Sequence, residues 1–163
     1  MITISTMLPQ HWEAVKTIYE QGIATGNATF QTTASTYQSW DEGHIKTCRL
    51  VATLNNEIVG WAALSAVSSR CVYGGVAEVS VYIATDSRGK SIGSMLLQEL
   101  IKQSEQNNFW TLQSGIFPEN KASIALHEKH GFRILGYREK IGKMDNLWRD
   151  TVIMERRSKT VGI

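Results

Sequence analysis

The sequence has few of the features that would indicate a special environment or a nucleic-acid partner. Its only cysteines, Cys48 and Cys71, lie in no C-x-x-C pattern or Cys/His cluster, so two free thiols in a reducing cytoplasm are expected. No apolar run approaches the roughly 20 residues that span a bilayer, and the opening MITISTMLPQ lacks the basic and apolar regions of a signal peptide. With 17 basic and 15 acidic residues the net charge is +2, which argues against a nucleic-acid-binding surface.

Segments that would divide the chain into separate domains are also absent. The 163 residues include only two prolines, Pro9 and Pro118, and no internal repeat or linker rich in Pro, Gly or Ser divides the chain. An apolar content of 42% is sufficient for a packed core. The sequence therefore predicts one domain, residues 1–156, with a short solvated tail at 157–163. No metal site is expected, because His127 and His130 are three residues apart and no third ligand is evident.

The spacing of apolar residues predicts a single mixed sheet flanked by helices. Strands are predicted at residues 2–4, 49–54, 57–66, 76–83, 110–117, 132–141 and 147–155. Helices are predicted from Pro9 to a loop at 22–33, and at 35–46, 91–107 and 120–129. The pair Asn55-Asn56 is typical of a tight hairpin turn, and Gly131 of the position after a helix.

The segment from Val81 to Ser94 carries the strongest chemical signal, because a strand passes through a short loop into a long helix. Such a helix N-terminus offers free N–H groups to an anion, and Arg88 and Lys90 add positive charge. Gly89-Lys-Ser91 also matches the end of a nucleotide-hydrolase phosphate loop. That match is judged accidental, because the first glycine would fall at Ala84 and no Asp ends the next strand.

Family motifs in this segment and elsewhere extend the signal over nearly the whole chain. Arg88-Gly-Lys-Ser-Ile-Gly93 resembles the R/Q-x-x-G-x-G/A motif of the GNAT superfamily of acyl-CoA-dependent N-acyltransferases, and Asn120–Phe132 resembles its N-x-x-[SA]-x-x-[LF]-[YH]-x-x-x-G-F segment. Glu78–Ile83, Leu126–Glu128 and Trp148–Asp150 are similar to the phosphinothricin and methionine sulfone group of amino-acid N-acetyltransferases. The sequence departs from the first motif at Ser91, where the family has glycine. The Ser91 hydroxyl can cap the helix or meet a phosphate oxygen, but its side chain can also weaken cofactor binding.

The resemblance implies an α+β fold: one mixed, largely antiparallel seven-stranded sheet, split between its central strands and flanked by about four helices. It implies acetyl-CoA as acetyl donor, a small-molecule amine as acceptor, no nucleic-acid or membrane partner, and a homodimer, which the apolar C-terminal strands also favour. The residues that the resemblance assigns to the cofactor are Val81, Tyr82, Ile83, Arg88, Gly89, Lys90, Ser91, Ile92, Gly93, Ser94, Asn120 and Ser123.

The resemblance also implies the chemical roles. Glu78 is the predicted general base, expected as a partly buried carboxylate at a strand end, and a surface carboxylate paired with a basic neighbour is the alternative. His127 stands where many relatives have a Tyr that protonates the leaving thiolate, and a packing role is its alternative. The residues predicted to line the acceptor pocket are Phe30, Arg70, Cys71, Val72 and Tyr73.

The predicted function is acetyl transfer to the primary amine of an amino acid or a toxic analogue. The alternatives are a catalytically idle acyl-CoA-binding regulatory module, and transfer to a protein or antibiotic amine.

Overall fold

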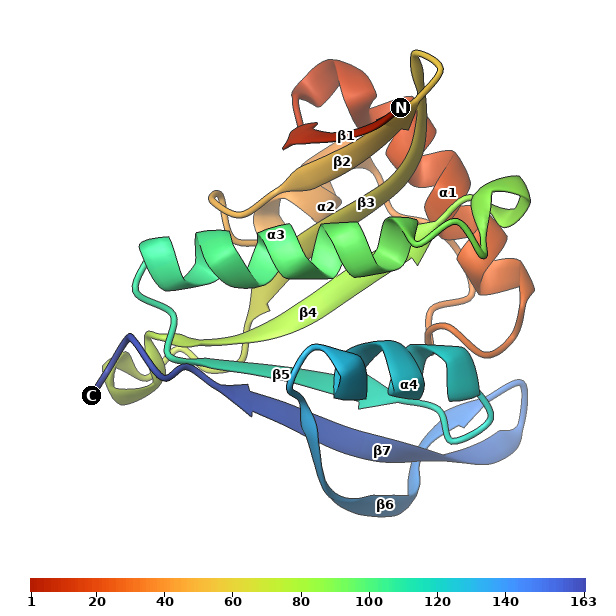
Figure 1. The fold of residues 1–163 in the computed structure, drawn as a ribbon. Helices are drawn as coiled ribbons and strands as arrows, with labels where there is room; N and C mark the ends of the chain where they lie inside the picture. Colours follow the sequence, from red (N-terminus) through yellow and green to blue (C-terminus); the bar gives the residue numbers. More distant parts are fainter.

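A computed structural model describes residues 1–163 and contains one seven-stranded sheet with four α-helices (Figure 1). The strands are β1 (Ile2–Thr6), β2 (Leu50–Leu54), β3 (Glu57–Ala66), β4 (Val76–Ile83), β5 (Thr111–Ile116), β6 (Arg133–Met144) and β7 (Leu147–Arg157). The helices are α1 (Trp12–Ala24), α2 (Tyr37–Gly43), α3 (Ile92–Gln106) and α4 (Lys121–Lys129). These elements occur in the predicted order, and the predicted fold class is confirmed.

The sheet has the strand order β1-β2-β3-β4-β5-β7-β6, and only β4 and β5 run parallel. Their pairing is short: it joins Val76 to Thr111 and ends where Glu78 meets Gln113. Beyond that point β4 remains paired with β3, and β5 with β7. The two central strands therefore diverge, and the predicted split between them is present.

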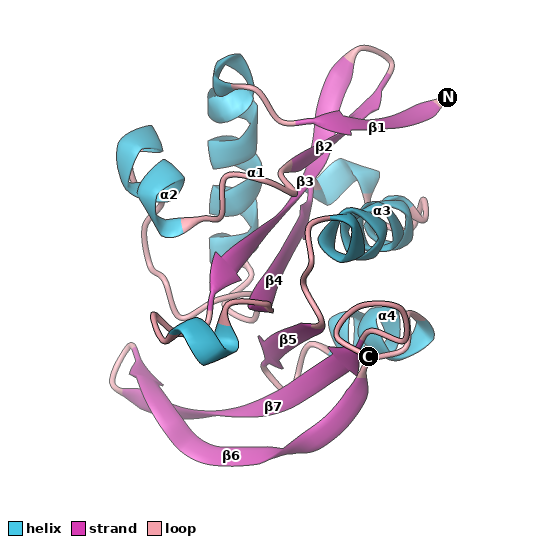
Figure 2. Ribbon diagram, turned by 90° about the vertical axis from the view of Figure 1, so that its left-hand side faces the viewer, coloured by secondary structure: helices cyan, strands magenta, loops and turns pink.

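The helices cover both faces of the sheet, α1 and α2 on one side and α3 and α4 on the other (Figure 2). Strand β3 shows how the sequence produces this arrangement, because successive side chains of a strand point to opposite faces. Trp61 and Ala63 belong to the core beneath α1 and α2, whereas Ala62 and Leu64 belong to the core beneath α3. The continuous apolar run of β3 is thus a consequence of burial on both faces.

Helix α3 is held by one apolar face. Ile92, Leu96, Leu97 and Leu100 have at most 1% of their surface exposed. Full burial of such a side chain contributes roughly 1.5–3 kcal/mol, so this face anchors the helix firmly. Its N-terminus is therefore held at one position over the end of β4.

Element ends differ from the sequence prediction at two helices. α1 continues to Ala24, three residues into the predicted loop. α2 is shorter than the predicted 35–46, because the Thr36 side chain accepts a hydrogen bond from Ser39 N and His44 is already extended. The Asn55-Asn56 turn is confirmed, since both residues have the positive φ of a two-residue hairpin turn.

The end of the chain is tied to the body of the protein. β7 runs to Arg157, and Arg156 forms an ion pair of 3.0 Å with Glu105 of α3. Ser158 donates its N–H to the Trp110 carbonyl and its hydroxyl to Glu105. Residues 157 and 158 are thus ordered parts of the structure and not a solvated tail.

Candidate active site

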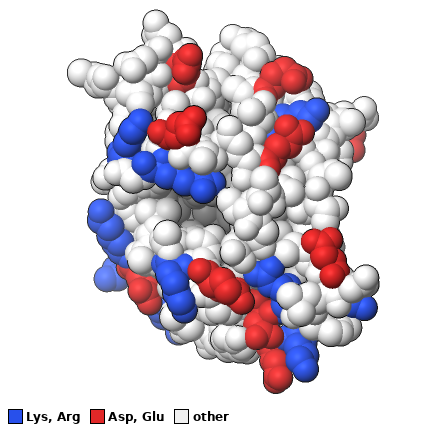
Figure 3. Space-filling model, turned by 90° about the vertical axis from the view of Figure 1, so that its right-hand side faces the viewer, with Lys and Arg blue, Asp and Glu red and all other residues white.

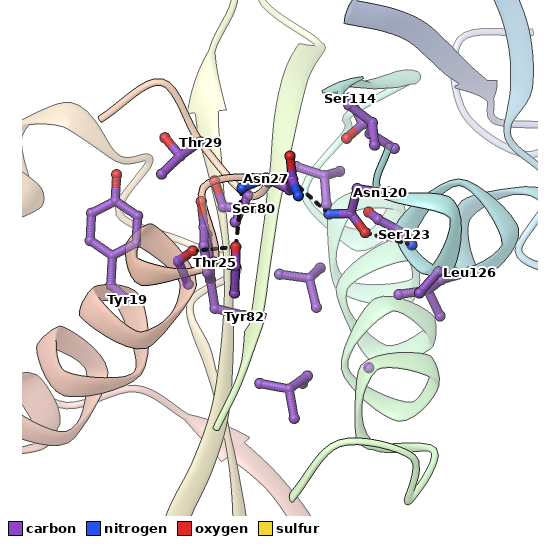
Figure 4. A pocket seen from close by; sticks show the side chains of 18 of the residues that line it. Tyr19, Thr25, Asn27, Thr29, Ser80, Tyr82, Ser114, Asn120, Ser123 and Leu126 are labelled. Atoms are coloured by element: carbon purple, nitrogen blue, oxygen red, sulfur yellow. Dashed lines mark hydrogen bonds between the residues drawn. The ribbon is translucent and has the colours of Figure 1, made fainter. Parts of the chain in front are cut away.

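The split between β4 and β5 forms a cavity of about 1170 Å³. Its walls come from both halves of the molecule: the α1–α2 loop (residues 25–36) and β4 on one side, and β5 and α4 on the other. The loop that leads into α3 closes one end. Figure 4 shows this arrangement, with Tyr82 and Ser80 of β4 facing Asn120 and Ser123 of α4 across the space.

An uncapped helix N-terminus faces this cavity. The first hydrogen bond within α3 runs from Met95 N to the Ser91 carbonyl, so the preceding N–H groups have no partner within the helix. No side chain caps them. Gly89 and Ser91 both have positive φ, 77° and 62°, which turns the backbone towards the helix. Together with Arg88, which lines the cavity, these groups fit a pyrophosphate.

Two residues of this loop differ from their predicted roles. The Ser91 hydroxyl does not cap α3, because its backbone is left-handed. Lys90 does not line the cavity, and its ammonium group donates to the Asp86 carbonyl at 3.2 Å. The other predicted loop residues, from Arg88 to Ser94, line the cavity.

A serine and a histidine join the two helices at the cavity. The Ser94 hydroxyl lies 2.7 Å from His130 Nε2. Burial, followed by the charges of Lys129 and Arg156, lowers the pKa of His130, which favours the neutral imidazole. This contact links the first turn of α3 to the end of α4, which fixes the loop that faces the cavity.

The free edge of β4 forms one wall. Val81, Tyr82 and Ile83 pair with β3 on one side and have no partner strand on the other. All three residues line the cavity, as predicted for backbone that receives the pantetheine arm. Burial raises the pKa of the Tyr82 hydroxyl, which keeps it protonated.

Glu78 is the carboxylate at the point where the strands diverge. It lines the cavity on the same face of β4 as Ser80 and Tyr82. Its Oε2 accepts a hydrogen bond of 3.3 Å from Gln113 Nε2. The expectation of a partly buried group at a strand end is wrong, because Glu78 is the third residue of β4 and is exposed. It has no basic partner within ion-pair distance either, so it is open to water and to an incoming amine.

His127 is buried, with 3% of its surface exposed. Its Nδ1 donates to the Ser123 carbonyl at 2.7 Å, and its ring packs edge-on against Phe132. Burial, partly offset by that hydrogen bond, lowers the pKa of His127. The neutral ring therefore has its proton on Nδ1, and Nε2 has no partner and no proton to give. These features favour the packing role.

Asn120 is already engaged within the protein. Its Oδ1 accepts from Ser123 N, which caps α4, and its Nδ2 donates to the Asn27 carbonyl at 3.2 Å (Figure 4). Both Asn120 and Ser123 line the cavity, as predicted. One N–H of the Asn120 amide remains for a ligand.

One side of the cavity has an aromatic wall. Tyr82 stacks on Trp61 at 4.9 Å between ring centroids, and Tyr19 meets both rings edge-on. Trp61 and Tyr19 were not among the predicted site residues, although each lies on the apolar face of its element. Phe30, the remaining residue predicted for the acceptor pocket, lines the cavity.

The predicted acceptor segment from Arg70 to Tyr73 is wrong. These residues form an exposed 3₁₀ turn (Cys71–Tyr73) in the β3–β4 connection, and none of them lines the cavity. The Arg70 guanidinium instead lies over the Tyr73 ring. The reason is the length of the hairpin: β3 runs to Ala66 and β4 begins at Val76, so the turn lies beyond the end of the split.

The charge around the cavity is uneven. The cationic side chains that line it are Arg88, Lys121 and Lys129, all on the α3 loop or on α4. Figure 3 views the side of the molecule towards which the α3 N-terminus points, and shows a hollow bordered by Lys and Arg side chains. His, Cys, Asp and Glu side chains form no group that could hold a metal ion, and no helix is long and apolar enough to cross a membrane.

Three features occur together here: a sheet split at its parallel pair, an uncapped helix N-terminus beside free strand backbone, and a carboxylate in the split. They define a class of transferases that bind an acyl-CoA thioester and acylate an amine. The chain belongs to the acetyltransferase (GNAT) family, whose model matches residues 12–132. It is an N-acetyltransferase, and its acetyl donor is acetyl-CoA.

Three similar proteins illustrate the relationship. The Bacillus subtilis (strain 168) protein YwnH, provisionally named a phosphinothricin acetyltransferase, is 35% identical over 149 residues, which cover 88% of this chain and 91% of YwnH. An L-methionine sulfoximine/L-methionine sulfone acetyltransferase of Pseudomonas paraeruginosa (strain DSM 24068 / PA7) is 33% identical over 61% of this chain and 58% of that protein. A Sinorhizobium meliloti phosphinothricin acetyltransferase, solved with acetyl-CoA, is 26% identical with a TM-score of 0.89, over 99% of this chain and 90% of that one.

Proposed function

We propose that this protein transfers the acetyl group of acetyl-CoA to the primary amine of an amino acid or a toxic amino-acid analogue, with Glu78 as general base. The observation that carries this proposal is the position of Glu78, exposed inside the split where β4 and β5 separate. The names of the relatives support the acceptor class. Detoxification is the role that such an activity would serve.

Acetyl transfer requires that the acceptor amine lose its proton before or during attack. The Glu78 carboxylate is open to the cavity, so it can take this proton directly or through water. Its hydrogen bond from Gln113 holds one oxygen and leaves the other free. Gln113 thereby orients the base without neutralising it.

The cofactor would be held by residues at the end of the cavity where the loop leads into α3, and by the neighbouring edge of β4. The uncapped N–H groups of α3 and the Arg88 guanidinium would bind the pyrophosphate, and the free edge of β4 would bind the pantetheine arm. Bound acetyl-CoA supplies the activated acetyl group as a thioester. A backbone N–H of Val81, Tyr82 or Ile83 would donate to the thioester oxygen, where negative charge develops during attack.

We place the acceptor against the aromatic wall of Tyr19, Trp61 and Tyr82, and the charge of this wall refines the choice of test substrates. This wall and the α1–α2 loop beside it offer hydroxyl and amide groups, but they contribute no Lys or Arg side chain to the cavity lining. A carboxylate would therefore need backbone N–H groups or a partner protomer for its recognition. This observation favours a second candidate acceptor, a primary amine without a carboxylate.

We further propose a single catalytic domain, which extends past the expected boundary at residue 156 to Ser158, a cytoplasmic location and a homodimer. Support for the homodimer comes from β6, an edge strand that exposes large apolar side chains. Ile134, Leu135, Tyr137 and Ile141 on β6 are each about half exposed, between 46% and 59%. A second copy would cover this surface. Sedimentation of the protein at several concentrations tests the dimer, and a monomer throughout would contradict it.

The function is tested by measuring thiol release from acetyl-CoA with a panel of amines. The panel contains methionine sulfone, methionine sulfoximine, phosphinothricin, methionine amide, an arylalkylamine and a peptide. We expect turnover with at least one small amine. Turnover of methionine amide without methionine sulfone would select the second candidate, and tight acetyl-CoA binding with no acceptor at all would select an idle binding module.

The role of Glu78 is tested with Glu78→Gln, and Glu57→Gln is the matched control, since Glu57 is exposed on β3 outside the cavity. We expect kcat of Glu78→Gln to fall by about two to four orders of magnitude at an unchanged Kd for acetyl-CoA. An unchanged kcat across the pH range would refute the assignment.

A further inference from the structure

The α1–α2 loop lies at the open end of the split and bridges its two halves. In the sequence this loop follows α1, which packs on the β1–β4 half of the sheet. Its polar contacts, however, run to α4 and β7, which belong to the other half. The β4–β5 pairing joins the halves over only three residue pairs at the closed end. The loop is thus a second connection between them, on the far side of the cavity.

Arg149 of β7 makes most of this connection. Its Nη1 donates to the Gly26 carbonyl and its Nη2 to Asn27 Oδ1, both at 2.8 Å. Nη2 also lies 3.3 Å from Glu119 Oε2, and the guanidinium carbon is 4.0 Å from the centre of the Phe117 ring. Only 11% of the Arg149 side chain is exposed. A nearly buried guanidinium that is satisfied by two loop acceptors is a fixed point for that loop.

Two further contacts bind the same loop. Asn120 donates to the Asn27 carbonyl at 3.2 Å, so Asn27 is held both by α4 and by β7. Three residues further on, Phe30 packs edge-on against Phe117, at 4.8 Å between ring centroids. Phe30 also lies against Gly142 of β6, where an added Cβ would come within 2.8 Å of the ring. The loop is therefore fixed at its polar turn and at its aromatic residue.

We propose that Arg149 is a positioning residue for acceptor binding: through Gly26 and Asn27 it holds the α1–α2 loop across the split and thereby preforms the wall that the acceptor contacts. Without Arg149 the loop keeps its apolar contact at Phe30 but loses its two charge-assisted hydrogen bonds, so the acceptor itself must order the loop. The effect falls mainly on the acceptor, because the α3 N-terminus makes no contact with Arg149. Asn120 touches the loop at Asn27, but its bond with Ser123 N holds it independently of Arg149. Arg149 does not itself line the cavity.

The first test measures the loop directly in the full-length protein by hydrogen exchange, resolved by peptide mass spectrometry. Arg149→Lys keeps the charge but cannot donate in one plane to two acceptors, and Arg149→Gln removes the charge. We expect exchange in residues 25–36 to accelerate about tenfold or more in both variants, while α3 is unchanged. Arg133→Gln is the control, because its ion pair with Glu155 lies in the same β6–β7 ribbon and does not touch the loop.

The second test is kinetic and rests on the proposed acetyltransferase function. With the best acceptor of the panel, we expect KM for the acceptor to rise about ten- to a hundredfold in Arg149→Lys, with KM for acetyl-CoA changed by less than about twofold. Asn27→Ala should reproduce part of this rise, and Asn27→Asp, which still accepts from Arg149, should not. In the Arg149→Gln background, Asn27→Ala should add little, because the contact is already lost.

Each outcome is decisive. Unchanged exchange in the loop, or an unchanged acceptor KM with a lower melting temperature alone, would overturn the proposal and leave Arg149 a residue of general stability. Where Arg149→Gln does not fold, Asn27→Ala and Arg149→Lys decide in its place. Failure of every amine in the panel would refute the proposed function, whereas the exchange measurement would still confirm or overturn the role of Arg149 in holding the loop.

Discussion

Replacement of Ser91 by glycine is expected to stabilise the protein. Ser91 precedes α3 in the left-handed region, at φ 62°, where the Cβ of an L-residue is crowded by the backbone. This conformation costs about 1–2 kcal/mol for residues other than glycine. A serine at a helix start usually offsets such a cost with a capping hydrogen bond, but the Ser91 side chain makes none.

The net gain is smaller than the strain that is removed, because glycine loses more backbone entropy on folding, by roughly 0.5–1 kcal/mol. Ser91→Gly should therefore raise the free energy of unfolding by about 0.5–1 kcal/mol. For a chain of this length, that corresponds to a rise in Tm of about 1–4 °C. Since the loop faces the cofactor cavity, Kd for acetyl-CoA should be no higher than in the unmodified protein.

The assay is thermal unfolding followed by circular dichroism, together with calorimetric titration of acetyl-CoA. Gly89→Ala is the matched variant of opposite sign: its φ is +77° and an added Cβ would meet nothing within 4 Å, so only backbone strain changes. It should lower Tm by a similar amount. A Tm of Ser91→Gly at or below that of the unmodified protein would refute the reasoning, since it would mean that the serine side chain stabilises this turn.

Three further predictions follow from other contacts. Gly75→Ala should destabilise the protein by about 1–3 kcal/mol, measured by urea unfolding, because its Cβ would lie 2.0 Å from the Trp110 ring; a loss below 0.5 kcal/mol would contradict this packing. Arg88→Ala should weaken acetyl-CoA binding about tenfold at low salt, because Arg88 lines the cavity. Lys90→Ala should weaken acetyl-CoA binding by less than about twofold, because Lys90 does not line it. Equal losses of affinity would contradict that placement. Burial lowers the pKa of His127, so the folded protein binds fewer protons than the unfolded chain as the pH falls. The neutral, buried His127 therefore contributes to stability above the unfolded pKa of about 6.5, and this contribution is lost as the pH falls below that value. His127→Phe should therefore flatten the fall in Tm between pH 7 and pH 5 while kcat stays within about threefold; a large loss of kcat would show that His127 takes part in the chemistry.

Much of the fold could be predicted from local pattern. The two faces of β3, the apolar stripe of α3 and the Asn55-Asn56 turn are consequences of side-chain period and backbone preference, which act over a few residues. Element ends were less accurate, as at α2, because they depend on single caps such as Thr36. The split itself was inferred only through the resemblance, since no local pattern shows where two strands stop pairing.

In the candidate site, too, features formed by neighbouring residues could be predicted and features formed by distant residues could not. The α3 loop could be recognised because a strand, two glycines and a helix start are contiguous in sequence. The aromatic wall proposed to contact the acceptor could not, because Trp61, Tyr19 and Tyr82 come from three elements and meet only in the folded protein. For the same reason Arg70 was misplaced, since the sequence does not show how far the β3–β4 hairpin extends beyond the cavity.

Four features could be recognised from the amino-acid sequence, because each depends on residues close together in the chain. They are the order of elements, the single mixed sheet, the anion-binding turn before α3 and the candidate carboxylate Glu78. Only the folded chain shows that Glu78 is exposed in the split, that His127 is buried and neutral, and that Lys90 does not line the cavity. It also brought Arg149 to a loop more than a hundred residues earlier in the chain. Burial and long-range hydrogen bonds depend on which surfaces meet, and that is a property of the whole packed chain.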